Sequence, residues 1–348
     1  VNKDARSTSA TTDDAEGNAL FIVDATDGSL VWKAVHGDST TTLPNTGSPT
    51  RFSHSGLTDS IPSRVAAIDM DSDNRIDRLY VGDTGGNVWR ADIVGIAGTD
   101  NRQNWSLTKL ASLGRHANTG KANDRRFFHA VDVVKSTDAA GAFDAVIIGS
   151  GDRANPLDYD PNYKVSEIKP ENWLYMIKDR AVHSSATGKP AITTLQQNDL
   201  ADLSDNCFQE DDGNCSSEQN AALANGWRVK LEDSGEKSLA RPVTFANIIY
   251  YTSYVPPVPS SCAPSEGTGY VYSLNLHNAS AALNYHGGNG EKLEKVDRRI
   301  ESGPGIPPEV VVIGTDSQGN LLIKTPTGLQ ALGIASRYRT HWYKSETE

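Results

Sequence analysis

Four aspartates lie within nine residues of this sequence, in the stretch DMDSDNRID. Asp69, Asp71 and Asp73 alternate like the first, third and fifth residues of a calcium-binding loop, whose carboxylates turn toward the ion and whose seventh residue offers its backbone carbonyl. The seventh residue here is Arg75, and the ninth is Asp77, a fourth carboxylate. Because calcium prefers several hard oxygen ligands in a flexible arrangement, the spacing predicts a Ca²⁺ site made by these five residues.

The loop departs from a complete EF-hand in two places. Asn74 stands at the sixth position, where glycine is usual, although Asn tolerates the left-handed backbone better than most residues. Tyr80 stands at the twelfth position, where an EF-hand has Glu, and the flanking residues resemble strands rather than helices. A solvated acidic turn without a metal is the alternative. Neighbouring carboxylates repel one another, and this repulsion favours a bound cation.

The other candidate sites are weaker. DATDGS has two aspartates and a glycine but is typical of a hairpin turn. In GSGDRANPLD we expect Asp152 and Arg153 to form a structural ion pair or a turn, because the G-x-S-x-G nucleophile motif is absent. The histidines show no paired spacing, and we expect these three to lie at the surface or in packing contacts: His54, His116 and His129. The sequence thus predicts no catalytic residue and no enzyme.

Composition narrows the class of protein. The 348 residues carry a net charge of −11, which argues against nucleic acid as a partner because nucleic-acid binding needs basic surfaces. No apolar run approaches the length of a membrane-spanning helix. Cys207 and Cys215 share a short polar loop, which favours a disulfide, with free thiols as the alternative. Cys262 is left over, either free or paired with a cysteine elsewhere in the protein.

The elements around these residues are short strands joined by tight turns. RLYVGDTGGNVWRADI follows the acidic loop directly and has the pattern of a hairpin with a G-G turn. Similar strand–turn–strand units recur in the ranges 19–35, 144–180, 239–276 and 308–328. Recurring sheets that cannot bury both faces alone favour a β-propeller, with a flat sandwich as the alternative. We expect long insertions near 95–125, 155–172, 181–225 and 256–266.

Five tryptophans lie near the ends of the expected strands. We expect them to pack between blades: Trp32, Trp89, Trp173, Trp227 and Trp342.

Several segments together resemble the C-terminal domain of the PilY/PilC family, the type IV pilus tip-associated adhesins and biogenesis factors of Gram-negative bacteria. They are DMDSDNRIDRLYVGDTGGNVWRADI, AVIIGSGDRANPLD, GWRVKLEDSGEKSLARPVTFANIIYYTSYVPP, SCAPSEGTGYVYSLNLHNASA and GPGIPPEVVVI. They follow one another in the family's order along nearly the whole chain. The acidic loop is the most specific of these marks, followed by EGTGYVYSLNL.

The resemblance implies an all-β fold, a modified quinoprotein-like β-propeller of about seven irregular blades with long loop insertions. Residues 1–348 would form one propeller domain, the C-terminal fragment of a larger protein whose N-terminal adhesive region is absent. The implied calcium ligands fall on Asp69, Asp71, Asp73, Asp77 and the Arg75 carbonyl. Calcium binding would be linked to pilus extension and retraction, and so to twitching motility and surface attachment.

The resemblance also implies partners and a location. The partners would be minor pilins at the pilus tip and the missing adhesive region, with host or abiotic surfaces as further candidates. Some members of the family carry an Arg-Gly-Asp motif tied to host integrins, and the sequence lacks this tripeptide. The location would be the cell surface and the pilus tip, reached by export through the outer membrane.

Two other functions are compatible with a propeller. A carbohydrate-binding propeller would stack sugars on aromatic residues of the insertions, such as those in ENWLY. A quinone-dependent dehydrogenase would share the architecture, but the adjacent cysteine pair typical of those enzymes is absent.

Overall fold

The structure is a computed structural model of residues 1–348. It describes the ranges 13–37, 43–46, 50–70, 72–93, 102–114, 121–157, 170–181, 192–205, 207–209, 214–257, 266–286, 292–315, 321–325 and 328–332.

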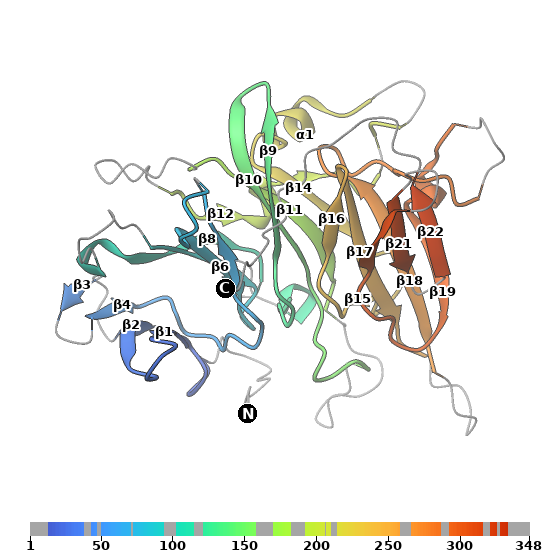
Figure 1. Ribbon diagram of the computed structural model, residues 1–348. Helices are drawn as coiled ribbons and strands as arrows, with labels where there is room; N and C mark the ends of the chain where they lie inside the picture. Colours follow the sequence, from blue (N-terminus) through green and yellow to red (C-terminus); the bar gives the residue numbers. More distant parts are fainter. Residues whose placement is uncertain are drawn as a thin grey trace.

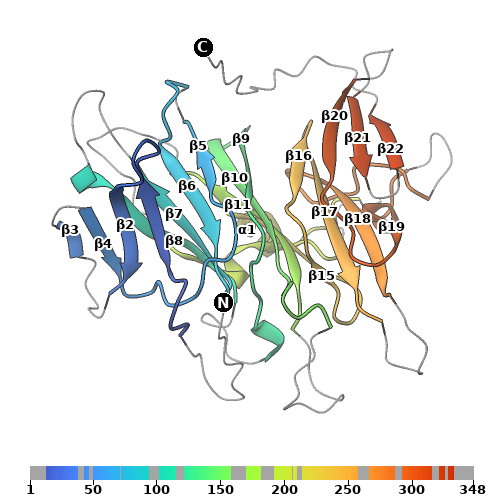
Figure 2. The same cartoon turned by 60° about the horizontal axis from the view of Figure 1, so that its bottom comes forward.

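The described residues form five sheets, numbered here in chain order and arranged side by side (Figures 1 and 2). Sheet 1 has the order β1 (Ala19–Val23), β2 (Leu30–His36), β4 (Thr50–His54) and β3 (Leu43–Thr46). Sheet 2 has the order β12 (Leu195–Gln196), β8 (Ser106–Ser112), β7 (Asn87–Asp92), β6 (Arg78–Gly82) and β5 (Ala66–Ile68). Sheet 3 has the order β13 (Ala201–Asp202), β14 (Gly226–Lys230), β11 (Trp173–Asp179), β10 (Gly141–Gly149) and β9 (Asp132–Asp138).

The last two sheets are formed by the C-terminal part of the chain. Sheet 4 has the order β15 (Lys237–Ser238), β17 (Ile248–Val255), β18 (Thr268–Asn275) and β19 (Arg299–Pro304), and β16 (Val243–Phe245) also pairs with β17. Sheet 5 consists of β20 (Val311–Thr315), β21 (Leu321–Thr325) and β22 (Gly328–Leu332). The predicted hairpins are confirmed, because β1 pairs with β2, β6 with β7, β10 with β11, β17 with β18 and β20 with β21.

Helices are few and short in the described residues: α1 (Ser217–Ala222) and the 3-10 turns η1 (Arg102–Asn104), η2 (Lys121–Asn123), η3 (Gln197–Asp199) and η4 (Lys295–Arg298). None of these helices has the length and apolar character needed to cross a bilayer.

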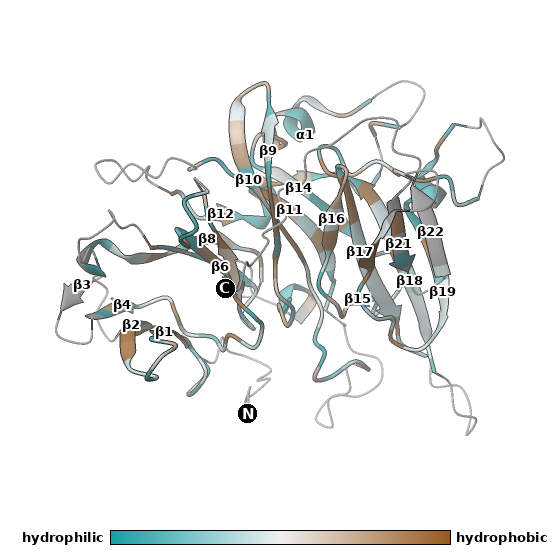
Figure 3. Ribbon diagram, viewed as in Figure 1, coloured by the Kyte–Doolittle hydropathy of each residue, from teal (hydrophilic) through white to brown (hydrophobic). Residues whose placement is uncertain are grey.

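Neighbouring sheets pack face to face, and each interface is a separate apolar core. In β10, Ala145 and Ile147 face sheet 4, while Val146 and Ile148 face sheet 2. Because successive side chains of a strand point to opposite faces, a strand buried on both faces is apolar throughout. Figure 3 shows these strands in the brown of hydrophobic residues, and the turns that join them are largely teal.

The tryptophans contribute to these interfaces as predicted. Trp32 and Trp89 lie between sheets 1 and 2, Trp173 lies between sheets 2 and 3, and Trp227 lies between sheets 3 and 4. Trp342 lies outside the described residues.

Edge strands of the three middle sheets come together. The strand β9 is in contact with both β5 and β16, each of which lies at the edge of its own sheet. In a β-propeller, the blades pack face to face and one edge of each blade lies near the centre of the ring, which is the arrangement seen here. Five sheets are described, and the expected number of about seven blades stays a prediction.

Two of the expected insertions contain sheet strands. The strand β8 falls within 95–125, and β12 and β13 fall within 181–225, where the sequence indicated only loops. The sequence of β8, SLTKLAS, lacks a strict apolar–polar alternation, and a bulge breaks its pairing with β7. The strands β12 and β13 have two residues each, too few for a periodic pattern, and add in parallel to the edges of sheets 2 and 3.

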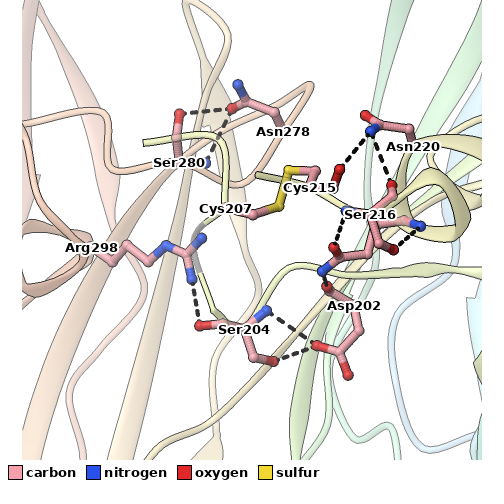
Figure 4. The surroundings of a disulfide bond; sticks show 10 residues. Asp202, Ser204, Cys207, Cys215, Ser216, Asn220, Asn278, Ser280 and Arg298 are labelled. Carbon is pink, nitrogen blue, oxygen red and sulfur yellow. Dashed lines mark hydrogen bonds between the residues drawn. A yellow bond between two sulfur atoms is a disulfide. The ribbon is translucent and has the colours of Figure 1, made fainter. Parts of the chain in front are cut away.

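The predicted disulfide between Cys207 and Cys215 is present in this second insertion, while Cys262 lies outside the described residues (Figure 4). Ser216 begins α1 with a capping box that it shares with Gln219. The side chain of Gln219 donates to the Asp202 carbonyl, so the helix is tied to β13.

Candidate metal site

The acidic loop joins β5 to β6, next to the edge where the middle sheets meet. Because Ile68 pairs with Arg78, the next residues out, Asp69 and Asp77, lie opposite each other at the base of the loop. The backbone N–H of Asp77 donates to the Ile68 carbonyl at 3.0 Å and closes this base. The N–H of Ile93 donates to the Asp77 carbonyl at 2.7 Å, which fixes the loop to the end of β7.

Asp69 organises the turn. Its carboxylate is 2% exposed and accepts from the N–H of Ser72 at 2.6 Å and from the N–H of Asn74 at 2.9 Å. Ser72 and Asn74 both have left-handed backbone, with φ of 67° and 68°. The left-handed conformation expected of Asn74 is therefore confirmed, whereas that of Ser72 had no signal in the sequence.

The other aspartates differ in their surroundings. Asp77 is partly buried and accepts from the N–H of Met70 at 2.6 Å, while Asp73 is exposed and accepts from the N–H of Arg75 at 2.9 Å. The Arg75 side chain is exposed. Asp71 lies outside the described residues.

Calcium binding by this loop stays a prediction. Among them, no three His, Cys, Asp or Glu side chains are grouped closely enough to hold a metal. Asp69 and Asp77 do share one end of a tight loop, and their oxygens are the hard donors that calcium prefers. A carboxylate oxygen that accepts one backbone N–H retains a lone pair for an ion. The donor chemistry and the turn fit calcium, and the convergence of three carboxylates depends on Asp71.

A lysine of the neighbouring sheet reaches the loop. Lys135 of β9 donates from Nζ to the Met70 carbonyl at 2.5 Å, and so connects sheet 3 to the loop of sheet 2. No sequence pattern indicated this contact, because Lys135 and Met70 are 65 positions apart.

A buried ionic network lies directly behind the loop, between sheets 2 and 3. Arg78 donates to Asp144 at 2.7 Å and to Asp92 at 3.3 Å, and Tyr80 donates to Asp179 at 2.7 Å. Burial raises the pKa of Asp144 above its usual range, although the charge of Arg78 acts in the opposite direction. Burial also raises the pKa of Tyr80, which therefore stays protonated as a donor. The only signal in the sequence is that Arg78, Asp92 and Asp179 stand at the ends of apolar strands, and this pattern does not indicate which residues pair.

The weaker candidates have structural roles. In DATDGS, Asp24 accepts from the N–H of Thr26 and Asp27 accepts from the N–H of Ser29, which confirms a hairpin turn. Asp152 accepts from the N–H of Asn155, which confirms a turn, and its carboxylate also lies 3.9 Å from the guanidinium of Arg126.

Two of the three histidines are described. His54 packs edge-on against Trp89, with ring centroids 4.9 Å apart, which confirms a packing role. Burial and, to a smaller extent, the charge of the nearby Arg153 lower the pKa of His129 to about 4. His116 lies outside the described residues.

The chain is similar in sequence to a type IV pilus factor, although no protein-family model matches it. It is 26% identical over 277 residues to the type IV pilus biogenesis factor PilY1 homolog of Xylella fastidiosa, a match that covers 76% of this chain and 17% of that protein. The chain therefore spans only 17% of the length of this curated relative.

Among solved structures, the chain is similar to the C-terminal domain of PilY1 from Pseudomonas aeruginosa. The TM-score is 0.53 at 18% identity, and the match covers 90% of this chain and 66% of that chain. This match shows the fold, a nearly all-β, propeller-like architecture. The sequence match and the shared fold together confirm the resemblance of this chain to the C-terminal domain of the PilY/PilC family of type IV pilus factors.

Proposed function

We propose that this chain is the calcium-binding β-propeller of a type IV pilus biogenesis factor, without catalytic activity of its own. The main support is the acidic loop, because Asp69 and Asp77 hold opposite sides of its base within a fold shared with PilY1. Asp69, Asp71, Asp73, Asp77 and the Arg75 carbonyl would hold the ion.

Calcium would act by fixing the conformation of the loop. Asp69 already orders two backbone N–H groups, and Asp77 fixes one more, so a shared cation would hold both ends of the loop together. The hydrogen bond from Lys135 would couple the conformation of the loop to sheet 3, and the hydrogen bond from Ile93 would couple it to sheet 2. Any surface that these sheets form would then bind its partner best in the calcium-loaded state.

The proposed location of this calcium-binding chain is the tip of a type IV pilus at the cell surface of a Gram-negative bacterium. Minor pilins and the adhesive N-terminal region of the same protein would be the partners. Pilus extension, twitching motility and surface attachment would depend on the contacts of this chain with these partners. The support is the match to a type IV pilus biogenesis factor.

Calorimetric titration with Ca²⁺ tests the ligand assignment. Asp69→Ala and Asp77→Ala are expected to abolish measurable binding, since each removes a carboxylate from the base of the loop. Asp73→Ala is a milder variant, because this side chain is exposed. Asp24→Ala is the control, an aspartate of another acidic turn whose loss should leave calcium affinity unchanged.

Circular dichroism must show that each variant is folded before its affinity is interpreted. Unchanged calcium affinity in both folded Asp69→Ala and folded Asp77→Ala would reject the ligand assignment. In the source bacterium, Asp69→Ala is expected to alter pilus-dependent surface motility and Asp24→Ala is not.

A further inference from the structure

Two arginines lie against one buried tryptophan between sheets 2 and 3. The guanidinium carbon of Arg228 is 4.9 Å from the centre of the Trp173 ring, and that of Arg125 is 5.9 Å from it. Trp173 begins β11, Arg228 belongs to the neighbouring strand β14, and Arg125 follows η2. Both separations allow a cation–π interaction, which attracts a cation to the ring but leaves its charge in place.

The positive charge of this pair is not balanced. Arg125 is 2% exposed and donates to two backbone carbonyls and one side-chain amide oxygen, all of them neutral. In the described part of the chain, no carboxylate forms an ion pair with Arg125, and the Glu171 carboxylate pairs with Lys230 instead. Arg228 has one acidic partner, Asp202, at 3.5 Å. Two cations therefore share one anion, and burying an uncompensated charge is costly.

Three buried nitrogen atoms around the same ring have no hydrogen-bond acceptor in the structure: Nε1 of Trp173, Nε2 of Gln197 and Nε of Arg228. Trp173 and Gln197 are 7% and 5% exposed. Gln197 accepts from the Tyr175 hydroxyl at 2.8 Å through Oε1, and its backbone carbonyl accepts from Nη1 of Arg228 at 2.6 Å. The amide nitrogen of Gln197 is thus a donor held beside Arg228. Native proteins rarely leave such buried donors unpaired.

We propose that Trp173, Gln197 and Arg228, with the charge of Arg125, form a binding site for a small oxyanion, a carboxylate or a phosphate. All three unpaired groups are donors, so the complementary ligand is an acceptor. The excess positive charge favours an anion over a neutral acceptor, because hydrogen bonds to charged oxygens are the stronger ones. The Arg228 side chain is 12% exposed and gives the site its contact with solvent.

This oxyanion site is separate from the acidic loop. Sheet 2 has β5 at one edge, next to the loop, and β12 at the other edge, directly before Gln197. An anion held by Gln197, Trp173 and Arg228 would bind the insertion after β11 to sheet 3. The proposed oxyanion site therefore does not depend on calcium.

NMR titration tests the proposal. The indole N–H signal of Trp173 is identified by its absence in Trp173→Phe. Sodium formate and sodium phosphate are the two probes, each added at constant pH and ionic strength. The Trp173 signal is expected to shift in a saturable way with at least one probe, while the indole signals of Trp32, Trp89 and Trp227 stay in place. Saturation by formate alone would assign the site to carboxylates, and saturation by phosphate alone to phosphates.

Two variants remove the site in different ways. Gln197→Glu keeps the acceptor for Tyr175 but places a carboxylate where the anion would bind, and Arg228→Gln removes a charged donor. Each is expected to raise the anion concentration at half-saturation at least about tenfold, since a hydrogen bond to a charged group is lost. Arg180→Gln is the matched control, because the charge of Arg180 is already paired with Asp138. Circular dichroism checks that each variant is folded.

The titration of the unaltered chain decides the proposal even where a variant fails to fold. The absence of a saturable shift with both probes would overturn it, and buried water would then be the acceptor for the three donors. A shift of all indole signals together would identify an adventitious ion only and would also overturn it. So would equal half-saturation in the unaltered chain and in folded Gln197→Glu and Arg228→Gln.

Discussion

Asp69 shows how one residue connects the turn to the proposed metal chemistry. Its buried carboxylate accepts two N–H groups of its own loop, so the backbone is shaped by the side chain that would bind the ion. The alternation of aspartates predicted this loop. It did not predict the position of Lys135, which comes from another sheet.

Arg78 is expected to be essential for stability. Arg78→Met removes the cation that pairs with buried Asp144, while Asp92 keeps Arg90 at 2.7 Å, and breaking such a buried pair costs about 3–5 kcal/mol. Urea denaturation measures the loss. Arg180→Met is the control, because Arg180 pairs with Asp138 near the surface, where an ion pair contributes less than about 1 kcal/mol. Equal losses in the two variants would contradict a special role for the buried network.

His129 is expected to make stability depend on pH. Burial holds its folded pKa at about 4, below the ordinary value of 6.5, so the unfolded chain takes up the proton first as the pH falls. The stabilisation from neutral His129 is complete above pH 6.5 and is lost toward pH 4. The unfolding free energy of His129→Gln should therefore fall less between about pH 7 and about pH 4.5 than that of the wild type. Parallel pH profiles would refute this assignment.

Among the elements, the insertion after β11 connects three sheets. Its β12 adds to sheet 2 and its β13 to sheet 3. Gln209 exchanges two hydrogen bonds with Ala281. Arg298 donates to the Ser204 carbonyl (Figure 4), so the insertion also contacts residues next to the strands of sheet 4. Short strands that cover sheet edges also protect those edges from pairing with other chains.

The disulfide is expected to stabilise this insertion. Cys207 is buried in the core between sheets 3 and 4, and closing so short a loop contributes about 2–3 kcal/mol. Replacing Cys207 and Cys215 together with Ala should lower the urea midpoint and speed hydrogen exchange in α1 and β13. Exchange that stays unchanged in those elements would show that the insertion is held by its hydrogen bonds alone.

The molecule as a whole is stabilised by apolar cores between consecutive sheets. Each of the three middle sheets contributes one face to each of two cores, so no single sheet has an interior of its own. Sheets 1 and 5 lack one neighbour each in the described residues.

Local sequence was enough to predict the hairpin strands, the disulfide and the acidic turn. These features depend on short-range patterns: apolar runs bounded by Gly and Asp, two cysteines in one loop, and aspartates at alternating positions. The contact of Lys135 with the loop, the network around Arg78 and the strands β8, β12 and β13 became visible only in the folded molecule. Those features join residues far apart in the chain, and such pairings follow from the stacking of sheets, which no local pattern records.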